Sequence, residues 1–175
     1  VAVAVGDEVA DLLVQKLSKS MKNLKFGAYT DSTNDFGPVI TKQHQQSVIN
    51  HISSAEKQGA NIVVDGRDAI VSGYENGFYV GGTLIDKVTP QMDSYKAEIF
   101  GPVLQIVRVA TMKDAMSLID NHEYGNGTCI FTRDGEAARY FSDHIKVGMV
   151  GINIPLPVPV AYHSFGGWKR SLFGD

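Results

Sequence analysis

The chain has 175 residues, of which 43% are hydrophobic and 20% charged, which suffices for one buried core but is short for two. Its formal net charge is −3 and both signs are mixed along the chain, so no nucleic-acid surface is expected. The longest apolar runs, 1–5 and 147–154, are too short to span a membrane. A single cysteine excludes an internal disulfide framework and, with no secretory leader before Val1, indicates a cytoplasmic protein, or a mitochondrial-matrix protein in a eukaryote.

The first part of the chain predicts a strand followed by two helices. Residues 1–5 are small and apolar, as in a buried strand, and Asp7 can cap a helix that ends at Gly27. Thr41 opens a second helix that ends at Gly59. The side chains expected to face inward are Val9, Leu12, Leu13, Leu17, Met21 and Leu24 in the first helix, and Val48, Ile49, Ile52 and Ala55 in the second.

Strands and helices then alternate along the rest of the chain. We expect strands over 61–64, 78–88 and 102–109, a helix from Thr111 through Asp120, a strand over 127–132, a helix over 134–145 and a strand over 149–154. Consecutive parallel strands need a crossover, so this alternation predicts an α/β fold: a mainly parallel sheet with helices packed on its faces. Prolines at 155, 157 and 159 predict that the segment running on through 163–167 is a loop.

Both ends of the chain predict a piece of a larger protein. Residues 1–5 have no methionine, cap or polar lead-in before them, as if the chain began inside an element. At the other end, 173–175 follow directly after a glycine-rich loop, with no element to cover it. We therefore expect a fold truncated at both ends.

Most nucleophilic and metal-binding patterns are absent from the sequence. Cys129 lies in an apolar strand pattern with no neighbouring cation or helix N-terminus to stabilise a thiolate, so we interpret it as a small buried residue. The five histidines lack the spacing of a metal site, and none is expected. The adjacent pair His163 and Ser164 has no assignable carboxylate partner, which disfavours a hydrolase.

Two short segments are candidates for ligand binding. Glu98 precedes an apolar strand, where a carboxylate could accept hydrogen bonds from both hydroxyls of a ribose; a surface ion pair with Lys96 is the alternative. The run 166–170, Gly-Gly-Trp-Lys-Arg, could approach an anion with its backbone amides and two cations, although it lacks the context of a P-loop and a surface turn is the simpler interpretation.

Taken together, these segments resemble the aldehyde dehydrogenase family over essentially the whole chain. The most specific motif is Glu-Ile-Phe-Gly-Pro-Val at 98–103, which resembles the segment that holds the nicotinamide riboside of NAD in that family. Three further motifs follow the same order, at 36–40, at 124–132 and at 164–169. The proline-rich stretch 150–160 and the run 165–171 look like the branch that acts on methylmalonate semialdehyde, with Leu172 where other branches carry a glycine.

The resemblance implies which parts of the machinery this chain holds. Residues 1–175 would be a partial catalytic domain, without the cofactor-binding domain, the loop of the nucleophilic cysteine and a final oligomerising strand. Glu98 and Phe100 would bind NAD, and the segment from Asn153 through Lys169 would wall a substrate tunnel, with candidates Asn153, Pro155, His163 and Phe165. No catalytic residue is expected in this chain, and Cys129 matches a position that is ordinarily a small strand residue.

The activity implied is NAD-dependent and uses coenzyme A as co-substrate. The intact enzyme would convert methylmalonate or malonate semialdehyde to propionyl-CoA or acetyl-CoA as a homo-oligomer, a dimer or a tetramer. The fragment alone would be inactive. The alternative is a non-catalytic α/β binding or interaction module that retains the scaffold without its chemistry.

Overall fold

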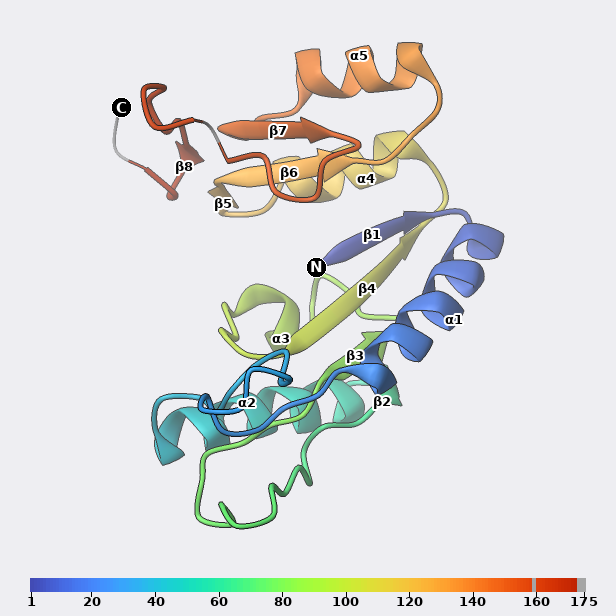
Figure 1. The fold of residues 1–175 in the computed structure, drawn as a ribbon. Helices are drawn as coiled ribbons and strands as arrows, with labels where there is room; N and C mark the ends of the chain where they lie inside the picture. Colours follow the sequence, from blue (N-terminus) through green and yellow to red (C-terminus); the bar gives the residue numbers. More distant parts are fainter. Residues whose placement is uncertain (159, 173–175) are drawn as a thin grey trace. The chain divides into compact units, whose positions relative to one another are not determined.

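The computed structural model describes residues 1–158 and 160–172 (Figure 1). The expected features of Pro159 and of 173–175 therefore lie outside the described residues. The chain divides into two compact units, Val1–Ala110 and Thr111–Asp175. No strand pairing among the described residues crosses from one unit to the other, and each unit has its own buried cluster of side chains.

The first unit is built on a four-stranded sheet in the order β1-β4-β3-β2. Its strands are β1 (Ala2–Val5), β4 (Val103–Val109), β3 (Thr83–Asp86) and β2 (Asn61–Val64). The first three run parallel, and β2 pairs antiparallel with β3 through an irregular register. The mainly parallel sheet predicted from the alternation of elements is confirmed. All four residues of β3 are buried, so both faces of the sheet are covered at this strand.

Helix α1 (Asp7–Asn23) covers one face of this sheet. Ala10, Leu13, Val14, Leu17 and Met21 recur at three- and four-residue steps and pack into the cluster with strand residues of β1, β3 and β4. Several details of the predicted helix were wrong. It ends at Asn23 and not at Gly27, and Leu24 is its exposed C-cap. The N-cap is Gly6, with φ of 88°, and Asp7 is the first helical residue. Val9 and Leu12 are 57% and 52% exposed because they lie beside the inward stripe.

The opposite face of the sheet carries α3 (Asp93–Lys96), a single turn that packs on α2 (Lys42–Lys57). The amide of Gln105 in β4 donates to the Ser94 carbonyl at 2.8 Å and thereby fixes α3 on the sheet. Helix α2 begins after the predicted cap, where Thr41 Oγ1 accepts from the His44 backbone N–H. The predicted inward residues Val48, Ile52 and Ala55 are fully buried.

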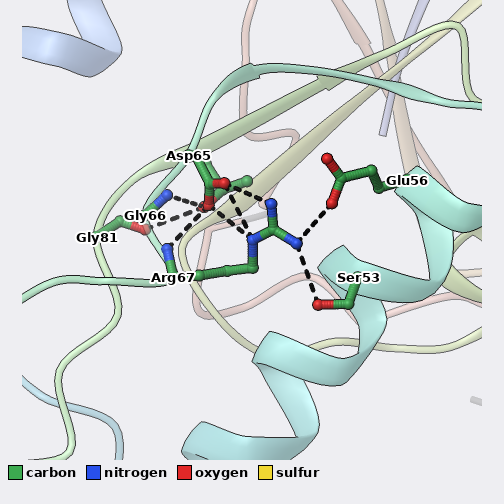
Figure 2. Close-up of polar contacts among 7 residues, drawn as sticks. Ser53, Glu56, Asp65, Gly66, Arg67 and Gly81 are labelled. Carbon is green, nitrogen blue, oxygen red and sulfur yellow. Dashed lines mark hydrogen bonds and ion pairs between the residues drawn. The ribbon is translucent and has the colours of Figure 1, made fainter.

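The loop after β2 is fastened to α2 by one guanidinium, as Figure 2 shows. Arg67 donates to the carboxylates of Asp65 and Glu56 and to Ser53 Oγ, the last two from α2. The same loop closes on the strand side, where the Gly81 N–H donates to the Gly66 carbonyl at 2.8 Å. A Cβ at Gly66 would lie 2.0 Å from the Gly81 carbonyl oxygen, so the two backbones approach each other as only glycine allows.

A buried ion pair joins the two central strands to α1. The Asp86 residue of β3 is 2% exposed and receives two hydrogen bonds from Arg108 of β4, at 3.0 and 2.7 Å. Arg108 also donates to Asp11 of α1 at 2.7 Å. Burial alone would raise the pKa of Asp86, but the Arg108 hydrogen bonds and one from the Lys87 backbone N–H outweigh it, so this pKa lies below its ordinary value of 3.8.

The second unit contains two short two-stranded sheets and two helices. Its elements are α4 (Met112–Asp120), β5 (Tyr124–Gly125), β6 (Gly127–Ile130), α5 (Gly135–His144), β7 (Met149–Ile152) and β8 (Trp168–Lys169). Strands β6 and β7 are parallel, with α5 as the crossover between them. The core combines Met116, Phe141, Ile145 and Val147 with apolar side chains of both strands.

Several predicted strands were too long, and some short elements were not predicted. The strand predicted over 78–88 is regular only over Thr83–Asp86, and Lys87 leaves it with φ of 58°. The strands predicted to end at 132 and 154 end at Ile130 and Ile152, because Asn153 turns left-handed directly after β7. The loop predicted through 163–167 is confirmed, but β8, which follows it directly and pairs antiparallel with β5, was missed. The helix α3 was also missed, since a single turn has no apolar period.

Candidate functional site

The strongest candidate segment, 97–102, joins α3 to β4 in the first unit. Glu98 is exposed, and none of the ion pairs among the described residues involves it, so the structure lends no support to a pair with Lys96. Phe100 is 78% exposed and has φ of 55°. The left-handed conformation costs a residue other than glycine on the order of 1 kcal/mol or more, so neighbouring groups must hold it.

Two groups on α2 hold the backbone beside Phe100. The imidazole Nε2 of His44 lies 2.8 Å from the Phe100 carbonyl oxygen. One turn further along the helix, Val48 lies against the next residue: a Cβ added at Gly101 would be 2.9 and 3.1 Å from the two Val48 methyl carbons. The glycine of the Phe-Gly-Pro motif is therefore required by a close approach to α2.

Helix α3, which precedes this segment, is held at its first residue by the C-terminal end of α2. Gln58 Nε2 donates to the Asp93 carboxylate at 2.7 Å, and the Asp93 backbone N–H donates back to Gln58 Oε1 at 3.0 Å. Ser54 Oγ lies 3.3 Å from the same carboxylate. Helix α2 and its C-cap therefore hold the start of α3 before Glu98 and the backbone of Phe100 after it, an arrangement that sequence reasoning did not find.

The second candidate is a groove of about 440 Å³ in the second unit. Its described lining consists of Gly148, Met149, Val150, Gly151, Ile152, Ile154, Pro157, Val158, His163, Ser164 and Gly166. Of the four side chains predicted for a substrate tunnel, only His163 lines this groove. Pro155 and Phe165 are exposed on the same connection. The groove is about equally polar and apolar: His163, Ser164 and the glycine backbone lie beside the apolar side chains.

The side chain of Asn153 is engaged in holding the backbone. Its Oδ1 accepts from the Thr132 N–H, and its Nδ2 donates to the Thr132 carbonyl, both at 3.0 Å. The Asn153 backbone N–H donates to the Ile130 carbonyl at 2.8 Å. With φ of 56°, Asn153 thus continues the β6–β7 pairing by one residue and turns the chain into the proline-rich connection.

Both cations of the glycine-rich run contact protein groups. Lys169 Nζ donates to the Ile119 carbonyl at the end of α4, at 2.9 Å, and burial lowers the pKa of this ammonium. Arg170 pairs with Glu123 and lies over the Tyr124 ring. The loop itself is packed tightly, since a Cβ at Gly148 would lie 2.0 Å from the Gly166 carbonyl oxygen. This run therefore stabilises the second unit, and the structure lends no support to an anion site there.

The described part of the chain has neither a metal-binding cluster nor a membrane-spanning helix. Within it, no three His, Cys, Asp or Glu side chains are grouped so that they could hold a metal ion. Nor does any helix there combine the length and apolar character that crossing a membrane requires. Cys129 is half-buried in β6, where a Cβ on the facing Gly151 would lie 3.2 Å from its sulfur.

Comparison with known proteins assigns the family. Residues 2–175 match the model of the aldehyde dehydrogenase family. The chain belongs to the aldehyde dehydrogenase family. It is 64% identical over 175 residues to the malonate-semialdehyde dehydrogenase of Pseudomonas aeruginosa, covering all of this chain and 35% of that protein. Malonate-semialdehyde dehydrogenase 1 of Geobacillus thermodenitrificans is 45% identical, with 36% of its length covered.

Solved structures of two family members share the fold of this aldehyde dehydrogenase chain. The crystal structure of methylmalonate-semialdehyde dehydrogenase (DddC) from Oceanimonas doudoroffii is 76% identical, with a TM-score of 0.97 over 99% of this chain and 36% of that one. A putative methylmalonate-semialdehyde dehydrogenase from Sinorhizobium meliloti 1021, complexed with NAD, is 56% identical. Its TM-score is 0.97, over 99% of this chain and 35% of that one. The predicted family and fold class are confirmed, and the chain spans about a third of these relatives.

Proposed function

We propose that residues 1–175 form part of the catalytic domain of an NAD-dependent, CoA-acylating dehydrogenase of malonate and methylmalonate semialdehydes. The relatives named above support the substrate class, and the NAD complex of one of them supports the cofactor. The observation that carries the proposal is the segment around Glu98 and Phe100. It presents a carboxylate and an aromatic ring to solvent, on a backbone held at both ends by α2.

The side chains of this segment fit the nicotinamide riboside end of NAD. A carboxylate has two acceptor oxygens, so Glu98 can accept a hydrogen bond from each of two neighbouring ribose hydroxyls. The exposed ring of Phe100 offers an apolar surface for the flat nicotinamide. NAD supplies the hydride acceptor in this chemistry, and the task of Glu98 and Phe100 is to hold it in one orientation.

The second unit is proposed to wall the route of the semialdehyde. In the groove, Met149, Ile154 and Pro157 offer an apolar surface for the short carbon chain of such a substrate, and His163 and Ser164 offer polar contacts for its charged and carbonyl ends. Asn153 acts here through the backbone, because its amide is paired with Thr132. We assign the nucleophilic cysteine to a part of the full-length protein outside residues 1–175, because Cys129 is a half-buried strand residue.

The proposal is tested on the full-length protein, meaning the product of the whole reading frame that encodes this chain. Purified protein is mixed with NAD and either semialdehyde, with and without coenzyme A, and NADH and the products are measured. We expect sustained formation of NADH, carbon dioxide and propionyl-CoA or acetyl-CoA only when coenzyme A is present as acyl acceptor; without it, NADH formation should stop after the first turnover. A full-length protein that folds and binds no NAD would instead support a non-catalytic module, and a free acid as sole product would refute the CoA-acylating assignment.

A further inference from the structure

We propose that His44 is a positioning residue for the cofactor segment: it holds the left-handed backbone at Phe100, and hence the orientation of the Phe100 ring and Glu98. The inference rests on the proposed function for the role of that segment. It adds a task for the side chain of His44, which lies 56 positions from Phe100 in the sequence.

The hydrogen bond defines what His44 must donate. A carbonyl oxygen only accepts, so the nitrogen 2.8 Å from the Phe100 oxygen, Nε2, must carry a proton. In the neutral ring this selects the Nε2–H tautomer, with Nδ1 as acceptor. We expect the contact to act as a fixed support.

His44 is itself held on a rigid element. Its backbone N–H donates to the Thr41 cap at 3.1 Å, so the first turn of α2 is closed at this residue. Val48 and Ile52 follow at steps of four on the same stripe and are fully buried, which fixes the rotation of the helix. A donor placed on such a support can hold a loop more firmly than a donor on another loop.

The conformation at Phe100 needs such a support. A residue with a Cβ avoids φ of 55°, and a change to negative φ would redirect both its ring and the peptide that leads back to Glu98. Gly101 cannot move toward α2, because Val48 fills that space. The His44 hydrogen bond is the polar contact that fixes the carbonyl between these two residues. Its loss should leave the fold intact and loosen the segment.

The test compares two amides of different length at position 44 of the full-length protein. In His44→Gln the terminal amide nitrogen takes the place of Nε2 along the side chain and can reach the carbonyl. In His44→Asn the amide nitrogen stops at the position of Nδ1 and falls short. Gln46→Leu, an exposed substitution on the same helix whose side chain bonds only within it, is the matched control. Three quantities are measured for the parent and the three variants. They are the rate of hydrogen exchange in peptides covering 97–103 without NAD, the dissociation constant for NAD, and the KM for the semialdehyde.

We expect His44→Asn to speed exchange of 97–103 and to weaken NAD binding about tenfold, with the semialdehyde KM little changed. His44→Gln should restore both properties to within about threefold of the parent, because it keeps the donor. Gln46→Leu should match the parent.

Equal exchange of 97–103 in His44→Asn and the parent would overturn the inference, and so would faster exchange with unchanged NAD affinity. Equal loss in the Gln and Asn variants would also contradict it, because the effect would not follow the donor. Failure of the proposed function is recognised separately: the unmodified parent would then bind no NAD, whatever the exchange data show.

Discussion

Cys129 is the only cysteine of the chain, and its surroundings are those of a packed strand residue. It lies in β6 opposite Gly151, at the centre of the parallel pair with β7. We therefore expect Cys129→Ala in the full-length protein to keep turnover within about threefold of the parent and to lower the free energy of unfolding by about 1 kcal/mol, the cost of a small half-buried side chain. Steady-state kinetics and denaturant unfolding measure the two effects. Loss of turnover in a folded Cys129→Ala protein would reverse this assignment.

At the residue scale, the sequence was informative wherever chemistry is encoded locally. Glu98 and Phe100 lie in one contiguous motif, so their pattern could be interpreted without a structure. The partners that hold them could not be found in this way. His44 was visible only as one of five histidines without metal spacing, and its relation to Phe100 arises because the loop before β4 lies against α2 in the folded unit.

Asn153 shows that the role of a side chain can also be hard to assign from the sequence. Its position at the start of the proline-rich connection suggested a lining residue of a tunnel, but its amide pairs with the backbone of Thr132. A sequence does not distinguish an asparagine that faces a ligand from one that completes a turn, because both uses favour the same residue type. The left-handed φ and the two paired distances resolve the difference.

At the scale of elements, helix starts were predicted best. Thr111 caps α4 with a complete capping box, in which Asp114 and Thr111 exchange hydrogen bonds, and Thr41 caps α2. Such signals are local, so they can be recognised in the sequence. Strand ends were predicted less well, since Lys87 and Asn153 end strands through a left-handed turn that no residue pattern announced. The two-residue strands β5 and β8 depend wholly on pairing with each other.

The Asp86–Arg108 pair should make the first unit sensitive to acid. Because the folded pKa of Asp86 lies below its unfolded value, the pair stabilises the fold at neutral pH, and this contribution is lost as pH falls through 3.8 and toward the lower folded pKa. Asp86→Asn should lower the free energy of unfolding by about 2 to 3 kcal/mol at pH 7, since Arg108 keeps its contact to Asp11, and by much less near pH 3.

Denaturant unfolding of the full-length protein at several pH values measures this effect. Asp11→Asn is the control: its carboxylate binds the same guanidinium, but the side chain is 72% exposed, so the change should stay below about 1 kcal/mol. A difference between Asp86→Asn and the parent that stays constant from pH 7 to pH 3 would contradict the assigned role of the buried carboxylate.

At the scale of the whole molecule, family membership covers residues 2–175, while the chain spans only about a third of its relatives. The predicted site residues are divided between the two compact units, with Glu98 and Phe100 in the first and the groove with His163 in the second. Sequence motifs named Glu98, Phe100 and His163 as candidates but not the other residues that line the groove. They could not reveal that each unit has its own strand pairing and core, because strand pairing is a property of the folded chain.

We expect purified residues 1–175 to form no NADH from malonate or methylmalonate semialdehyde, with or without coenzyme A. The chain's one thiol is the half-buried Cys129, and the proposed nucleophile belongs to another part of the full-length protein. The measurement is an absorbance assay at high protein concentration against a blank without protein. NAD-dependent acyl-CoA formation by residues 1–175 alone would require a nucleophile within them and would refute the proposed division of the enzyme.

The central claim is that Glu98 holds the nicotinamide ribose of NAD, and single-turnover formation of NADH by Glu98→Gln in the full-length protein tests it most directly. The amide keeps the shape of the side chain but removes its charge and one of its two acceptor oxygens. We expect weaker NAD binding and hydride transfer slower by about tenfold or more, because misplaced reacting atoms are costly. Alkylation of the catalytic cysteine should change little, since that step needs no cofactor.

Glu123→Gln provides the matched comparison, because Glu123 is a carboxylate in a surface ion pair with Arg170. It should leave NADH formation unchanged and alter stability by less than about 1 kcal/mol. We expect a slow hydride-transfer step in Glu98→Gln and a parent-like step in Glu123→Gln. A Glu98→Gln protein with the parent's NAD affinity and the parent's single-turnover rate would contradict it.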